Sequence, residues 1–185
     1  MRGCITLHKP RIFGAALHIH WAVLVAGGIL FGAMIKQPLH AALFVCSYFG
    51  VMLLHEAGHA FVARRLGCRP SHIYLTFIHG HCECDLPDSL REHAMLAWGG
   101  VLAQLAVAMP LLLLGEIAPL AANACFGILL VVFGYFSLSV VILNLMPAEG
   151  LDGALAWRLV PMLVRDIFQR HAAKKAAKEV LRRFK

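Results

Sequence analysis

The residues best suited to chemistry form one short motif, His55-Glu56-Ala57-Gly58-His59. Residues four apart share one face of an α-helix, so His55 and His59 can direct ring nitrogens at a single metal ion. Glu56 lies beside them as a carboxylate that can move protons for a metal-activated water. Catalytic Zn²⁺ takes three protein ligands and lowers the pKa of its water to about 7. The motif therefore predicts a zinc site, one ion per chain, with Glu56 as general base.

The residues that lead into this motif are strongly apolar. From Leu39 to Leu54, only His40 and Ser47 have plainly polar side chains. An ionisable residue toward the middle of a membrane-spanning helix costs roughly 2.5 to 3.5 kcal/mol on insertion scales. Three such residues together indicate a bound metal more strongly than they indicate a solvated helix surface.

The composition is that of an integral membrane protein. Of the 185 residues, 60% are hydrophobic and only 15% are charged, and the six cysteines are scattered without the spacing of a disulfide framework. A spanning helix needs about 20 apolar residues. We expect an all-α membrane protein with four transmembrane helices, over residues 12–35, 39–66, 94–114 and 117–146.

The basic residues predict how these helices are oriented. With the N-terminus in the cytoplasm, every Lys and Arg except Lys36 falls on the cytoplasmic side, so both termini are expected there. The net charge of +7 then indicates orientation and attraction to anionic lipid. It does not indicate nucleic-acid binding.

The third zinc ligand is expected near the end of the last span. Pro147 and Gly150 end the helix, and Asp152 follows the break. The predicted topology brings this break to the same side of the membrane as His55 and His59. A capping carboxylate is the structural alternative for Asp152, and Glu149 is the nearest competing carboxylate.

Polar residues near the first and third spans have less specific interpretations. His18, His20 and Trp21 suit anchoring at the membrane interface better than metal binding. Gly99 and Ala103 have the small-xxx-small spacing that lets helices approach closely. Gln104 then either bonds to a neighbouring helix or faces the zinc cavity.

The connection between the second and third spans, residues 69–90, contains one strand-like segment. Residues 71–78 are β-branched and aromatic, and Gly80 follows them as a turn residue, so a short β-hairpin is expected. The cluster from His79 to Cys84 favours an ordinary polar rim over a regulatory metal or redox site, because its spacing is not that of structural zinc.

The C-terminal residues predict an amphipathic basic helix on the inner leaflet. We divide the chain into a transmembrane domain, residues 1–165, and a basic amphipathic tail, residues 166–185. Apolar residues that can share one stripe of this tail are Ile167, Phe168, Val180, Leu181 and Phe184.

Together these motifs resemble those of the site-2 protease family of intramembrane zinc metalloproteases. His55 to His59 matches the H-E-x-x-H of that family, and Asn144 to Gly153 matches its N-x-x-P-x-x-x-L-D-G. The G-P-x-x-N of the intervening helix corresponds to Gly100-Val-Leu-Ala-Gln104, with Val for Pro and Gln for Asn. With neither an inserted peptide-binding domain nor a nucleotide-sensing domain, the chain resembles a minimal member.

The resemblance implies hydrolysis of a peptide bond in or near a transmembrane segment of a membrane-protein substrate, in a prokaryotic cytoplasmic membrane. His55, His59 and Asp152 would hold zinc, and Glu56 would activate water. Asn144 and Gln104 would bind substrate or stabilise the oxyanion. Segment 71–78 is a candidate edge for pairing with the substrate strand. The alternative function is a metal transporter or carrier that uses the histidines and cysteines.

Overall fold

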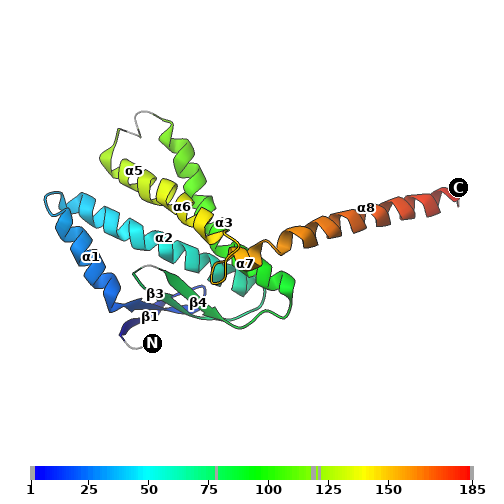
Figure 1. Cartoon of the computed structure of the whole chain (residues 1–185), viewed down its shortest axis with the longest axis horizontal. Coiled ribbons are helices and arrows are strands. Elements are labelled where there is room, and N and C mark those ends of the chain that lie inside the picture. The colour runs from blue at the N-terminus through cyan, green and yellow to red at the C-terminus, as the bar shows by residue number, and fades with distance from the viewer. Residues whose placement is uncertain (1–2, 78, 118–119, 121, 184–185) are drawn as a thin grey trace.

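The computed structural model describes residues 3–77, 79–117, 120 and 122–183 (Figure 1). Its helical bundle lies against a small sheet, and one long C-terminal helix extends away from both. The elements in chain order are β1 (Cys4–Ile12), β2 (Ala15–His20), α1 (Trp21–Ala33), α2 (Pro38–Arg65), β3 (Pro70–Leu75), β4 (Gly80–Cys84), α3 (Leu90–Gly115), α5 (Ala124–Leu129), the π-helix η1 (Leu130–Phe136), α6 (Ser137–Asn144), α7 (Gly153–Ala156) and α8 (Leu159–Arg183).

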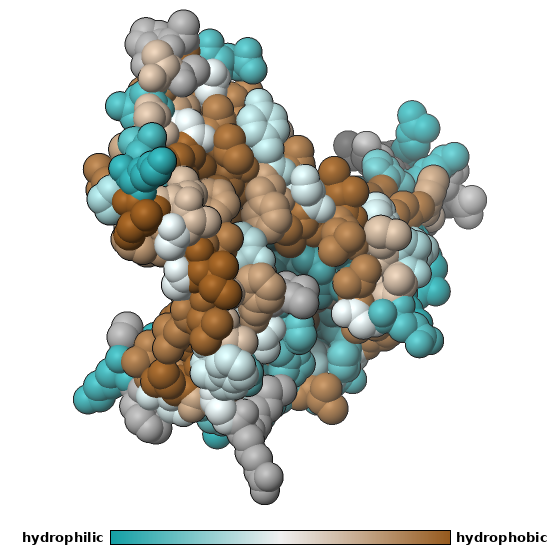
Figure 2. All heavy atoms as spheres, turned by 60° about the vertical axis from the view of Figure 1, so that its left-hand side comes forward, coloured by the Kyte–Doolittle hydropathy of each residue, from teal (hydrophilic) through white to brown (hydrophobic). Residues whose placement is uncertain are grey.

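Three helices are long and apolar enough to cross a membrane: α2, α3 and the continuous helix of α5, η1 and α6. Local signals define their ends. Pro38 begins α2, and Ser89 and Glu92 form a capping box at the start of α3. Hydrophobic side chains cover much of the face drawn in Figure 2, as expected for helices surrounded by lipid.

The expected first span is not a single long helix. Residues up to His20 form strands, and α1 has only 13 residues. That length is short of the roughly 20 residues a spanning helix needs. The alternation of Leu17 and Ile19 with His18 and His20 is a strand pattern, which a count of apolar residues over 12–35 does not detect. The orientation of the termini stays a prediction.

The sheet has the strand order β1-β2-β3-β4. Strands β1 and β2 are antiparallel, β2 and β3 are parallel, and β3 and β4 are antiparallel. The expected strand at 71–78 corresponds to β3, while Ile78 lies outside the described residues. Because β3 lies between β2 and β4, it is not an edge, and the prediction that it pairs with substrate is wrong. Strand β4 forms the edge on that side.

One face of the sheet packs against α2. Ile73 and Leu75 of β3 are almost fully buried in a cluster with Ala60 of α2, and Met52 and Leu53 pack against this cluster. The sheet is thereby held beside the C-terminal half of α2, which carries the H-E-x-x-H motif.

Helices α2 and α3 approach each other closely at glycines. A Cβ atom on Gly58 would lie 2.4 Å from the carbonyl oxygen of Gly99 and 2.7 Å from the Ala103 Cβ. Both distances are too short for any larger side chain. The structure therefore confirms the small-residue contact expected at Gly99 and Ala103.

The first third of helix α8 is joined to the bundle by an ion pair. Arg91, in the first turn of α3, forms a 2.7 Å ion pair with Asp166. From there α8 extends away from the other elements (Figure 1). The helix runs without a break through residue 165, and the domain division proposed there stays a prediction.

Candidate metal centre

Two imidazole rings face each other on α2. His55 and His59 are one helical turn apart, and their Nε2 atoms are 3.0 Å from each other. His55 is 8% exposed, and only 13% of the His59 side chain is accessible. The helix thus presents two nitrogen ligands at one buried point, as the motif predicts.

Asp152 reaches this point from the other end of the chain. Its Oδ2 atom lies 3.0 Å from the His55 Nε2 and 3.4 Å from the His59 Nε2. In a tetrahedral zinc site with bonds of 2.0 to 2.1 Å, neighbouring ligand atoms are about 3.3 to 3.4 Å apart. Among the described residues, these three form the one group of His, Cys, Asp or Glu whose ligand atoms converge.

The second nitrogen of each imidazole fixes its tautomer. His59 Nδ1 is 2.8 Å from the carbonyl oxygen of Leu96, and His55 Nδ1 is 2.9 Å from the Gln104 Oε1. Both partners accept hydrogen bonds, so each Nδ1 can donate its proton and leave a lone pair on Nε2 for a cation. Two lone pairs then face the oxygen of Asp152. This donor set fits a cation, and the acceptors behind both histidines are those expected around zinc.

Helix α3 leaves room for these rings at one residue. A Cβ atom on Gly100 would lie 2.6 Å from both the His55 Cε1 and the His59 Nε2. Any side chain at position 100 would therefore occupy the space of the imidazoles. In the sequence, Gly100 is notable only as part of the motif Gly100 to Gln104. Residue spacing could not show that it lies against the histidines, because they belong to a different helix.

Two tryptophan indoles hold the segment that carries Asp152. The Trp98 Nε1–H of α3 donates to the Ala156 carbonyl at 2.9 Å, and the Trp157 Nε1–H donates to the Leu145 carbonyl at 2.6 Å. Gly153 is also required, because its Cβ would lie 2.4 Å from the Leu145 carbonyl oxygen. These contacts tie α7, which starts just after Asp152, to α3 and α6. No pattern in the sequence indicated these two indole hydrogen bonds, because their acceptors are backbone carbonyls of other segments.

Glu56 lies beside the ligand group but is not part of it. Glu56 is 6% exposed and lies close to the start of β4. A Cβ on Gly80 would come within 2.5 Å of the Glu56 Oε1. The edge strand therefore passes directly over the carboxylate that the sequence assigns as the base.

The other candidate residues, Gln104, Asn144 and Glu149, differ in how deeply they are buried. Gln104 is fully buried, and its Oε1 accepts from His55, which is the bond to a neighbouring helix. Asn144 is half-buried at the last turn of α6, and its expected role toward substrate stays a prediction. Glu149 is exposed.

The cluster from His79 to Cys84 does not converge on one point. Strand β4 alternates exposed His81 and Glu83 with half-buried Cys82 and Cys84, because successive strand residues point to opposite faces. Burial, together with the nearby charge of Glu56, raises the pKa of the Cys82 thiol to about 12. A thiol that stays protonated is a poor metal ligand. This geometry favours the polar rim over a second metal site.

The three residues expected at the membrane interface, His18, His20 and Trp21, lie at the end of β2 and the start of α1. His18 bonds to Thr6 Oγ1 through Nδ1 and to His72 Nδ1 through Nε2, both at 2.9 Å. His20 accepts from the Ala22 backbone and caps α1. Trp21 is 55% exposed, as interfacial anchoring requires.

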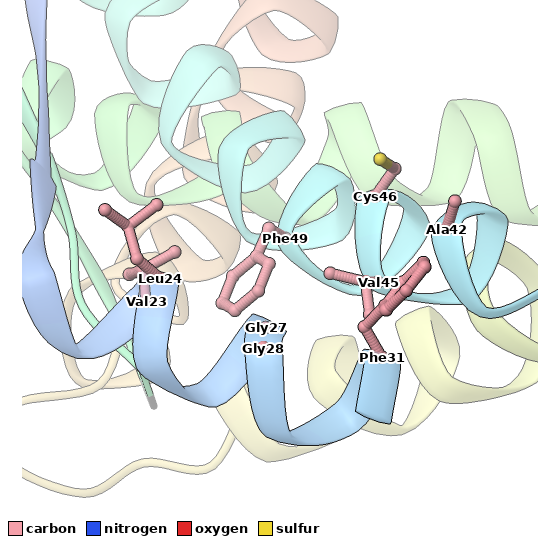
Figure 3. A pocket seen from close by; sticks show the side chains of 9 residues that line it. All are labelled: Val23, Leu24, Gly27, Gly28, Phe31, Ala42, Val45, Cys46 and Phe49. Atoms are coloured by element: carbon pink, nitrogen blue, oxygen red, sulfur yellow. The ribbon is translucent and has the colours of Figure 1, made fainter. Parts of the chain in front are cut away.

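An apolar cavity of about 400 Å³ lies between α1 and α2, away from the candidate metal centre (Figure 3). Its walls include Val23, Gly27 and Phe31 of α1 and Ala42, Val45 and Phe49 of α2. None of the candidate site residues lines it.

The fold and the site together define a class of protein in which helices of membrane-spanning length hold a buried to half-buried His-His-Asp group beside a small sheet. A solved structure with this fold is the site-2 protease from Methanocaldococcus jannaschii. The similarity has a TM-score of 0.64 and 23% sequence identity, and it covers 85% of this chain and 71% of that one. No protein-family model and no curated protein matches the sequence. The shared fold agrees with the family resemblance carried by the two motifs.

Proposed function

We propose that this chain is a zinc-dependent intramembrane endopeptidase that cleaves membrane-protein substrates in or near a transmembrane segment. The observation that carries this proposal is the convergence of three ligand atoms, from His55, His59 and Asp152, in a helix bundle with the fold of a site-2 protease. A zinc ion held there would supply Lewis-acid activation of a water and of the scissile carbonyl.

Residues of this chain would supply the remaining chemistry. Glu56 is buried beside the ligand group, where its carboxylate can accept a proton from the attacking water and pass it to the leaving amine. Low exposure excludes bulk water and strengthens its electrostatic interactions. Asn144 is proposed to orient the substrate or its oxyanion. The contact of Gln104 with His55 favours a positioning role for that residue.

The substrate backbone would be received at β4. A transmembrane helix must unwind before it can be cut, and its unpaired backbone groups are costly in an apolar setting. Strand β4 is an edge of the sheet, and Glu56 fills the space that a side chain on its first residue, Gly80, would need. A substrate strand paired with β4 would therefore lie beside the base.

The transporter alternative has less support. Many transporters are built from internal repeats, and this sequence shows no obvious repeat. A transporter also has no use for a buried Glu56 next to its first ligand.

Glu56→Gln tests the proposal. Membrane vesicles with the parent or the variant are compared by mass spectrometry of new protein termini within transmembrane segments. The variant is expected to bind zinc as the parent does and to lose about 10² to 10⁴-fold in cleavage rate. Glu149→Gln is the matched control, because it removes the same charge from an exposed side chain. Equal cleavage by parent and Glu56→Gln would refute the proposed function.

A further inference from the structure

Helix α8 carries a row of uncovered apolar side chains. Val160, Leu163, Val164, Ile167 and Phe168 are between 41% and 70% exposed. Their spacing of three and four residues places them on one side of the helix. This stripe starts at Val160, whereas the stripe expected from the sequence starts at Ile167. In that expected stripe, the side chains of Val180 and Leu181 and the whole of Phe184 lie outside the described residues.

Basic residues continue the same side of the helix. At 100° per residue, Lys174, Lys175 and Arg182 fall within about 60° of Val160, whereas Arg165 falls about 140° away, on the opposite side. All four are exposed. One face of α8 is therefore apolar close to the bundle and positively charged farther out.

Helix α8 begins where the bundle ends. It starts 15 residues after Asn144, the last residue of a candidate span, and Asp166 ties it to the first turn of α3. The last turn of α2, with Arg64 and Arg65, and the first turn of α3 pack at this end of the bundle. A long helix without tertiary contacts is marginal in water, since most helical stability in proteins comes from packing of an amphipathic face.

We propose that α8 binds the surface of an anionic lipid bilayer. The apolar stripe would enter the boundary between headgroups and acyl chains, and the basic part of the same face would meet lipid phosphates. Each basic residue near an anionic surface strengthens binding by about fivefold. The proposal rests on the membrane-spanning helices and not on peptide-bond cleavage.

A second copy of α8 fits this face less well. An interhelical seam needs apolar residues at intervals of three and four along its length. Here the positions that continue the stripe are His171, Lys174 and Lys175. In a parallel pair these lysines would lie opposite each other and repel.

Hydrogen–deuterium exchange of the full chain in lipid nanodiscs tests the proposal. Amides of residues 159–175 are expected to exchange at least fivefold more slowly in phosphatidylcholine containing phosphatidylglycerol than in phosphatidylcholine alone. Lys174→Gln/Lys175→Gln should reduce the difference. Arg165→Gln, which removes one charge from the opposite side, should leave it unchanged, whereas its single-charge match Lys174→Gln should reduce it.

Two results would overturn the proposal. One is exchange of α8 that is equally fast in both lipids. The other is slow exchange in both lipids together with a dimer mass in native mass spectrometry, which would assign the face to a second copy. Neither result measures peptide-bond cleavage, so the proposed function is tested independently of this proposal.

Discussion

Gln104→Leu should weaken zinc binding without unfolding the protein. Gln104 is fully buried, so no solvent can replace its Oε1 as the acceptor for His55 Nδ1–H. Leaving a buried donor unpaired costs about 1 to 3 kcal/mol, which corresponds to about fivefold to 150-fold in affinity. Loss of an acceptor behind a metal-binding histidine typically costs 10- to 100-fold, and we expect a value in that range.

The Gln104 amide has a feature that separates zinc affinity from folding stability. Its Nε2 is buried with no hydrogen-bond partner among the described residues. Leucine removes this unsatisfied donor, and without zinc His55 can carry its proton on Nε2, 3.0 Å from the Asp152 Oδ2, so the metal-free protein should lose little stability. Zinc on Nε2 would instead leave the Nδ1 proton of His55 without an acceptor. The cost should appear in zinc affinity, measured in detergent by competition with a fluorescent chelator.

The controls are Ser137→Ala and Gln104→Glu. Ser137 is equally buried, and its Oγ likewise has no partner in the described chain, but it does not contact His55. Ser137→Ala should bind zinc as the parent does, and Gln104→Glu should restore an acceptor and much of the affinity. If Gln104→Leu and the parent have the same zinc affinity, the inferred role of Gln104 is refuted.

Three further predictions concern the surroundings of the site. Gly100→Ala should abolish zinc binding, measured by elemental analysis, because the added Cβ would lie 2.6 Å from imidazole atoms. Gly28→Ala is the control and should bind zinc as the parent does, because no atom lies within 4 Å of its added Cβ. Trp98→Phe removes an indole hydrogen bond and should weaken zinc binding by about fivefold or more; unchanged affinity in the chelator assay would argue against it. With a pKa of about 12, Cys82 should be alkylated by iodoacetamide only slowly at pH 8, and its rate should rise about tenfold per pH unit, followed by peptide mass spectrometry.

Part of the fold followed directly from local patterns in the sequence. Long apolar runs were sufficient to find α2 and α3 to within a few residues, because membrane thickness sets the length of such runs. The same criterion was misleading at the N-terminus. There His18 and His20 alternate with apolar neighbours and form β2, and no hydropathy average distinguishes an apolar strand from an apolar helix.

The sequence by itself determined which side chains could meet. Helical spacing placed His55 and His59 on one face, and the break at Pro147 and Gly150 brought Asp152 to the same end of the bundle. These are consequences of backbone geometry and of span direction, and both can be read along the chain.

Only the tertiary structure decided how those side chains are held. The acceptors for the two Nδ1 atoms come from Gln104 and from the backbone of Leu96, the space for the rings comes from Gly100, and the strand over Glu56 begins at Gly80. None of these partners is set by local spacing, because each depends on how closely α2 packs against α3 and the sheet. Contacts between elements distant in sequence are fixed by packing, and packing is a property of the whole fold.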